Sequence, residues 1–310
     1  MWPNIVSQRY AYPTKLRRPV HHLQSHVINA SHLPSSVDLR KWMTPVEDQK
    51  DMNTCVANAF AGACEYFMKK STGNHIDVSR LFVNYNGRLV ESPTMTTQDV
   101  GSSLIYTAIA LRRYGICEEA IWKYDRKNLN QRPSDTAYMR GSQFTVTVVK
   151  LQPTLIAMKT VLAKKLPFVV SIVLLESARQ EGEERNGYIL MPNPADPRVK
   201  HAKLGHAVLI VGYDDETQHF IVRNSWGSDW GHNGYFFIPY QYLLNPKLFL
   251  ADEGLWIVKN ISFRQRYSLP IRKVTASNSY GSCRNYQNRP SINQIYPLKS
   301  SSKRSVRYHI

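Results

Sequence analysis

A chain of 310 residues with 43% hydrophobic side chains has room for one large domain or two half-domains, which excludes a fibrous or disordered protein. The formal net charge of +17 lies mostly at the two ends. Residues 261–310 hold ten Lys and Arg and no acidic residue, and residues 1–40 hold five Lys and Arg and one acidic residue. The body is nearly neutral, so any attraction to a polyanion is expected from the ends.

The cysteines and the apolar runs narrow the class of protein further. Four cysteines occur, at Cys55, Cys64, Cys117 and Cys283, with no CxxC pair or other zinc-ligand spacing. The longest apolar stretch is far shorter than the about 20 residues of a membrane helix, and no signal-peptide-like run is visible at the N-terminus. We therefore expect no metal, no cofactor and no transmembrane segment, in a cytoplasmic or particle-associated protein.

The first half of the chain shows mainly helical patterns. Residues 1–33 have neither a helical nor a strand period and are expected to form a basic leader, a candidate short pro-segment. Small and apolar residues recur at helical spacing over 55–70, which predicts a helix with Cys55 at or near its N-terminus. Further helices are predicted over 104–114 and from about 155 to 164.

After Pro167 the pattern changes to β-branched and aromatic runs separated by turn residues. Strands are expected within 168–175, 206–215, 218–226 and 234–243. A helical first half followed by a β-rich second half predicts an α+β protein with a cleft between the halves. The expected division is 1–33 leader, 34–150 helical half, 151–258 β-rich half and 259–310 basic tail.

Three residues carry the chemistry that a thiol-dependent hydrolase needs. Cys55 at a helix N-terminus is placed where the helix dipole and a neighbouring imidazolium lower the thiol pKa. His206 opens a β run and supplies an imidazole, and Asn224 can accept from its second nitrogen while Trp226 shields that bond. Taken singly, each has an ordinary structural interpretation as a core cysteine, a structural histidine or a turn residue.

Taken together, the segments that hold these residues resemble the papain-like, or cathepsin-like, cysteine peptidases. The resemblance covers about residues 34–258 and rests on LPSSVDLR at 33–40, PVEDQ at 45–49, GSSL at 101–104, YGICEEAIWKY at 114–124, GH at 205–206 and NSWGSDWGHNGY at 224–235. It implies a helical half-domain with Cys55 and an antiparallel β-barrel-like half-domain with His206 and Asn224. Peptide then binds in the cleft between them.

The resemblance also implies roles for further residues. Gln49, six residues before Cys55, corresponds to the family's oxyanion donor. The candidate substrate-binding residues are Gly101, Ser102, Leu104, Leu204, Gly205, Trp226 and Trp230. Leu104 and Leu204 are expected at the second-subsite pocket, and Trp230 on the leaving-group side.

The chain departs from the family pattern at three places. Met52 and Val56 stand where secreted members have a disulfide cysteine and a tryptophan, in agreement with a reducing compartment. Ser102 replaces the second of two adjacent glycines, and its side chain is expected to narrow the groove. The family's long inhibitory pro-region has no counterpart, so we expect residues 1–33 either to occlude the cleft or to have no inhibitory role.

Residues 259–310 interleave Lys and Arg with tyrosines, a pattern that binds nucleic acid or another polyanion, or forms a solvated tail with no ligand. For the body we expect a monomeric endopeptidase acting on peptides or proteins. Two alternatives stay open. One is a related amidase or exopeptidase, whose specificity the polar loop 178–203 would create, and the other is a papain-like binding module without catalysis.

Overall fold

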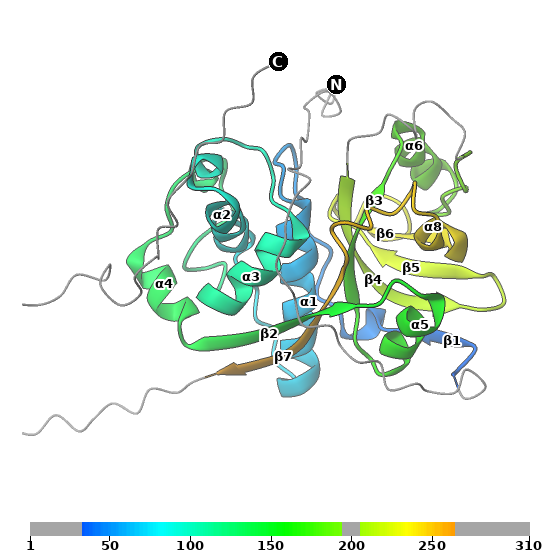
Figure 1. Cartoon of the computed structure of the whole chain (residues 1–310), viewed down its shortest axis with the longest axis horizontal. Helices are drawn as coiled ribbons and strands as arrows, with labels where there is room; N and C mark the ends of the chain where they lie inside the picture. The colour runs from blue at the N-terminus through cyan, green and yellow to red at the C-terminus, as the bar shows by residue number, and fades with distance from the viewer. Residues whose placement is uncertain (1–32, 194–204, 264–310) are drawn as a thin grey trace, which may run out of the picture. The chain divides into compact units, whose positions relative to one another are not determined.

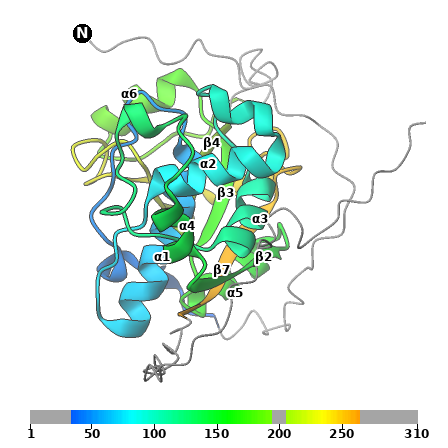
Figure 2. The same ribbon diagram turned by 90° about the vertical axis from the view of Figure 1, so that its left-hand side faces the viewer.

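Helices and strands form two groups in the computed structural model, which describes residues 33–193 and 205–263 (Figure 1). Helix α1 (Cys55–Thr72) packs against α2 (Arg80–Glu91) on one side and against strand β4 (Gly205–Asp214) on the other. Helix α3 (Leu104–Tyr114) packs on α2. The helical group and the sheet therefore meet along α1, as Figures 1 and 2 show.

The three helices predicted from the sequence are present. Helix α1 begins at Cys55 and ends at Thr72. Gly73 follows as the C-cap, with a positive φ of 75°, the left-handed conformation that glycine adopts at low cost. Helix α3 has the predicted bounds, and α5 (Leu155–Ala163) begins after Thr154, whose side chain accepts from the N–H of Ala157.

Helix α2 was not predicted, although Ser79 caps it by accepting from the N–H of Phe82. The other helical elements are α4 (Asp135–Gly141), α6 (Glu176–Glu184), α8 (Tyr240–Leu244) and the short 3-10 helices η3 (Arg40–Trp42), η4 (Pro93–Thr97) and η5 (Arg126–Asn128).

The sheet has the strand order β2-β7-β3-β4-β5-β6, with β1 paired to β4 off this path. All of these pairings are antiparallel. The strands besides β4 are β1 (Ser36–Asp38), β2 (Phe144–Leu151), β3 (Phe168–Val173), β5 (His219–Arg223), β6 (Tyr235–Pro239) and β7 (Leu255–Phe263). The expected α+β architecture with an antiparallel sheet is thus confirmed.

The strand predicted over 234–243 is only half correct. Strand β6 ends at Pro239, which pairs with His219, the first residue of β5. The N–H of Tyr240 still donates to Gln218 O at 2.9 Å, but Gln218 has a φ of 56° and is not part of a strand, so the ladder ends and the chain continues as helix α8. The sequence patterns also missed β2 and β7. Strand β7 includes residues 259–263, which composition alone groups with the basic tail.

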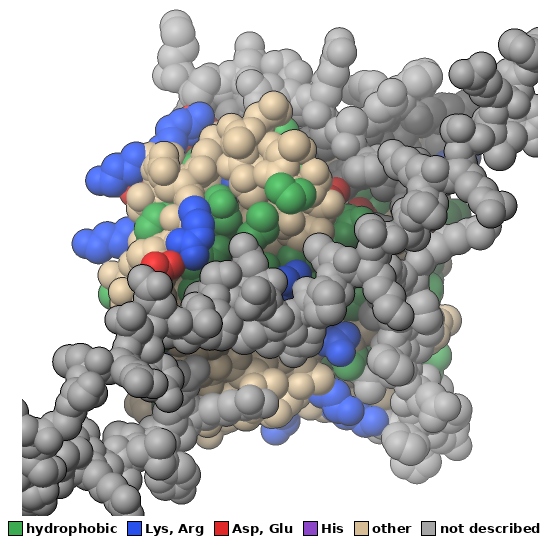
Figure 3. Space-filling model, turned by 60° about the vertical axis from the view of Figure 1, so that its left-hand side comes forward, with side chains coloured by type: hydrophobic (Ala, Val, Ile, Leu, Met, Phe, Trp, Pro, Cys, Tyr) green, Lys and Arg blue, Asp and Glu red, His purple; other side chains and the backbone are tan. Residues whose placement is uncertain are grey.

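Residues 33–193 and 205–263 all belong to one compact unit, Met1–Arg266, so the half-domain boundaries stay a prediction. None of the helices in these described segments is long and apolar enough to cross a membrane. The described residues also carry several Lys and Arg side chains on one face, with few acidic side chains beside them (Figure 3).

Candidate active site

Cys55 is the first residue of α1, so the predicted position at a helix N-terminus is confirmed. Its side chain is buried, and the backbone N–H groups of Ala207 and Val56 are within hydrogen-bond reach of its sulfur. Burial raises the pKa of the thiol, and these N–H groups lower it in part. The thiol therefore needs a base beside it to ionise near neutral pH. Ala207 is the chain neighbour of His206.

His206 and Asn224 are joined by a hydrogen bond of 2.8 Å between Nε2 and Oδ1. Asn224 Oδ1 also accepts from the N–H of Ser225 at 2.9 Å, which identifies it as the acceptor oxygen. His206 Nε2 must therefore carry a proton and donate it to this oxygen. The basic nitrogen of the neutral ring is then Nδ1.

The imidazole of His206 is covered by Trp226, whose ring stacks on it with a centroid separation of 4.9 Å. Burial lowers the pKa of His206 to about 4, and the hydrogen bond that His206 donates to Asn224 works in the opposite direction. Beside an uncharged thiol the ring is therefore neutral at neutral pH. In that form it can accept the thiol proton.

Gln49 lies on the segment that leads into α1, and its side-chain amide has a fixed orientation. The hydroxyl of Ser225 donates to Gln49 Oε1 at 2.6 Å, and the backbone N–H of Gln49 donates to Ser225 O at 2.8 Å. Gln49 Nε2 donates one hydrogen to Met52 O at 3.0 Å. Because an amide nitrogen has two hydrogens, one is left for an oxyanion.

Two of the predicted substrate-binding residues on the segment 101–104, here called the groove wall, have buried side chains. Ser102 is buried and its Oγ accepts from Thr107 Oγ1 at 3.0 Å, beside Gly87. The expectation that Ser102 narrows the groove is therefore wrong, because its hydroxyl lies in the packing between α2 and α3. Leu104 is fully buried and Gly101 is buried with φ of 74°, so this wall offers mainly backbone.

Trp226 and Trp230 have different surroundings. Trp226 is half-buried against His206, whereas Trp230 is buried and packs on Trp226 with a centroid separation of 4.8 Å. Trp230 Nε1 donates to Arg179 O at 3.2 Å, and the Arg179 guanidinium lies 5.3 Å from the Trp226 ring. Trp226 thus packs against both Trp230 and the Arg179 guanidinium. The sequence patterns did not indicate Arg179.

The remaining predicted subsite residues are Gly205 and Leu204. Gly205 opens β4, and a Cβ there would approach Leu250 Cδ1 to 2.4 Å, so glycine leaves room for that side chain. Leu204 lies outside the described residues.

A pair of carboxylates beside the wall was also missed by the sequence analysis. Glu253, just before β7, accepts from the N–H of Leu104 at 2.7 Å, and Glu91 accepts from the N–H of Ser103 at 3.2 Å. Burial raises the pKa of Glu253 to about 7 and also raises that of Glu91. Glu253 is 149 residues from Leu104 and Glu91 is 12 residues from Ser103, and neither separation is one that a helix or strand period would indicate.

The other two described cysteines lie in the core. Cys64 and Cys117 are buried, and burial raises the pKa of both thiols, that of Cys117 to about 12. The three cysteines that the structure describes are free. Across the described residues, no group of three or more His, Cys, Asp and Glu side chains could hold a metal ion.

A buried thiol at the N-terminus of α1, a helix that packs on β4, and a histidine of β4 bonded to an asparagine are the groups that a thiol-dependent hydrolase uses. The model of the papain family of cysteine proteases matches residues 33–243. The chain therefore belongs to the papain family of cysteine proteases and is a peptidase.

Individual relatives agree with this family. An uncharacterised peptidase C1-like protein of Acanthamoeba polyphaga mimivirus is 31% identical over 73% of this chain and 74% of its own length. Mouse cathepsin K (Mus musculus) is 30% identical over 66% of this chain, which spans 59% of that relative. The crystal structure of xylellain, a cysteine protease from Xylella fastidiosa, is 28% identical with a TM-score of 0.69, covering 82% of this chain and 98% of that one.

Proposed function

We propose that this chain is a catalytically competent endopeptidase in which Cys55, His206, Asn224 and Gln49 do the chemistry. The observation that carries the proposal is the 2.8 Å bond from His206 Nε2 to Asn224 Oδ1. This bond leaves Nδ1 as the base, on the residue next to Ala207, whose N–H reaches the Cys55 sulfur.

The proposed reaction begins when Cys55 gives its proton to His206 Nδ1, which forms a thiolate and an imidazolium that stabilise each other. The thiolate attacks the carbonyl carbon of the scissile bond. The oxyanion accepts from Gln49 Nε2 and the backbone N–H of Cys55. The imidazolium then protonates the leaving amine, and water, deprotonated by the same histidine, hydrolyses the thioester.

Arg179 favours a second candidate, a peptidase that removes residues from a C-terminus. Trp226 stacks on the ring that would protonate the leaving amine, and Arg179 lies over Trp226 with a half-exposed guanidinium. Arg179 Nε lies 3.9 Å from Glu183 Oε1, and in this candidate the terminal carboxylate of a short leaving peptide takes the place of that partner.

One experiment separates the two candidates. A peptide of about ten residues, acetylated and amidated at its ends, is compared with its free-acid form, and the products are identified by mass spectrometry. An endopeptidase cleaves internal bonds of both forms, whereas a carboxy-directed enzyme shortens only the free acid. Cleavage that persists in Cys55→Ala, or its absence in the unmodified chain, would contradict the proposed function.

A further inference from the structure

The segment 49–55, here called the nucleophile loop, has to place two oxyanion donors at one point. Gln49 supplies the side-chain donor and Cys55 the backbone donor, and each must lie about 2.7–3.1 Å from the same oxygen. The loop is a tight one, because the N–H of Met52 donates to Gln49 O at 3.2 Å and Lys50 has a φ of 53°. A side chain from another segment that bonds to both ends of the loop would fix the distance between them.

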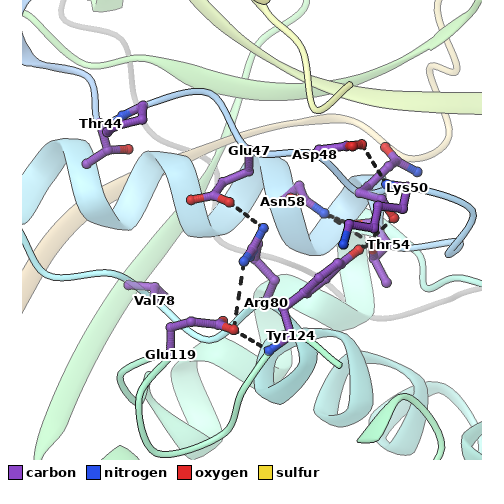
Figure 4. Close-up of polar contacts among 12 residues, drawn as sticks. Thr44, Glu47, Asp48, Lys50, Thr54, Asn58, Val78, Arg80, Glu119 and Tyr124 are labelled. Carbon is purple, nitrogen blue, oxygen red and sulfur yellow. Dashed lines mark hydrogen bonds and ion pairs between the residues drawn. The ribbon is translucent and has the colours of Figure 1, made fainter. Parts of the chain in front are cut away.

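Tyr124 bonds at both ends of this loop through one hydroxyl group. Figure 4 shows this hydroxyl beside Thr54. The hydroxyl donates to Gln49 O at 2.9 Å and lies 2.6 Å from Thr54 Oγ1. Because its single hydrogen goes to Gln49, it must accept from Thr54, which in turn accepts from Asn58 Nδ2 at 3.1 Å. The result is a directed chain from Asn58 through Thr54 and Tyr124 to Gln49, in which each bond polarises the next.

The ring of Tyr124 is itself held in place. The Arg80 guanidinium lies 4.1 Å from the ring centroid, and its Nη1 pairs with Glu47 at 2.6 Å (Figure 4). Glu119 accepts from the N–H of Tyr124 and lies 3.8 Å from Arg80 Nη2. Arg80 is buried, so this cation–π contact is little weakened by water. Burial raises the pKa of Tyr124 to about 12, which keeps its hydroxyl protonated at working pH.

We propose that Tyr124 is a positioning residue that sets the separation of the Gln49 and Cys55 oxyanion donors, with Arg80 as its support. The inference rests on the proposed function. The two hydrogen bonds of the Tyr124 hydroxyl go to Gln49 and Thr54 and not to the thiol or the imidazole. Its effect on the reaction is therefore exerted through the ends of the nucleophile loop. Removing its hydroxyl should therefore weaken oxyanion stabilisation and leave the ionisation of Cys55 unchanged.

The test uses Tyr124→Phe in the full chain, which removes both hydrogen bonds and keeps the ring on Arg80. We expect kcat to fall about 10- to 100-fold with KM within about twofold, a part of the 100- to 1000-fold effect of losing a whole oxyanion donor. Affinity for a peptidyl aldehyde, whose adduct with Cys55 places an oxygen at the same donors, should fall by a similar factor. The rate and pH profile of alkylation by iodoacetamide, which needs no oxyanion, should stay unchanged.

The matched control is Tyr138→Phe, because the Tyr138 hydroxyl also makes a hydrogen bond, to Asn86 Oδ1 at 3.0 Å, but lies outside the nucleophile loop. Thr54→Val is a second variant, which removes the hydroxyl that bonds to Tyr124 at the other end of the loop. It should also lower kcat and the affinity for the peptidyl aldehyde. Unchanged kcat and aldehyde affinity in a folded Tyr124→Phe, or a parallel loss of iodoacetamide reactivity, would overturn the inference. An unmodified chain that neither cleaves peptide nor binds the aldehyde would overturn the proposed function as well.

Discussion

At the residue scale, the orientation of one amide decides whether the oxyanion site can work. The Gln49 side chain would present its oxygen instead of its Nε2–H if it flipped, and the Ser225 hydroxyl prevents this by donating to Oε1 at 2.6 Å. Ser225 lies directly after Asn224, so a single turn fixes both the histidine and the glutamine. The motif was visible in the sequence, but its serine gave no sign of this second contact.

We predict that Ser225→Ala lowers kcat about tenfold and changes KM little, because Gln49 loses the bond that fixes its orientation. Ser228→Ala is the control, since Ser228 is exposed and its hydroxyl bonds only to the neighbouring Asp229 among the contacts found for it. Steady-state kinetics on one peptide substrate measures both. Equal kcat values for the two variants would contradict the role of Ser225.

At the scale of elements, the groove wall depends on contacts that are long-range in sequence. Asn53, beside Met52 in the nucleophile loop, donates through its N–H and Nδ2 to Asp99 Oδ1 and O at 3.0 and 2.7 Å. Two hydrogen bonds thus tie the loop to the segment before Gly101. This tie does not depend on the redox state of the surroundings.

The N-terminus of α3 is held by carboxylates from other elements, and this arrangement predicts a pH dependence. With the pKa of Glu253 raised from 4.5 to about 7, the folded chain keeps a proton in this window that the unfolded chain has released. The free energy of unfolding should therefore fall as the pH rises from about 4.5 to 7, by up to about 1.4 kcal/mol per pH unit.

Glu253→Gln, which imitates the protonated carboxyl, should remove this part of the slope and keep an acceptor for the N–H of Leu104. Denaturant unfolding at several pH values between 5 and 7 measures the difference. Identical slopes for the unmodified chain and Glu253→Gln would show that this carboxyl does not titrate in the window.

Element prediction succeeded where the local pattern is strong and failed where tertiary contacts decide. The helices at Cys55 and Leu104 follow from periodicity and end signals, and the core of β4 follows from its β-branched run. Residues 240–244 look like strand but become α8 because the partner strand has ended. Strand β7 was missed because its register is set by β2, more than a hundred residues earlier.

The same contrast holds for the site. Motif and spacing were enough to propose Cys55, His206, Asn224 and Gln49, because the family resemblance carries these positions. Contacts such as Tyr124 with Gln49 and Glu253 with Leu104 join residues 75 and 149 positions apart. No spacing rule indicates them, and only the folded chain brings them together.

At the scale of the whole molecule, the helical group and the sheet meet along α1, which places Cys55 beside the strand that carries His206. Residues 1–32, 194–204 and 264–310 lie outside the described residues. Occlusion of the cleft by residues 1–33, polyanion binding by the tail, a monomeric state and a cytoplasmic or particle-associated location therefore stay predictions. The polar loop expected over 178–203 is wrong at its start, because residues 178–184 belong to helix α6.

The central claim is that Cys55 is an activated thiol in a peptide-accepting site, and active-site titration tests it most directly. The full chain, Cys55→Ala and Cys64→Ala are each incubated with a peptidyl epoxide and weighed by intact mass spectrometry. We expect one adduct on the unmodified chain and on Cys64→Ala, since Cys64 is fully buried, and none on Cys55→Ala. An adduct that survives Cys55→Ala, or no adduct on a folded chain with or without residues 1–33, would contradict the account.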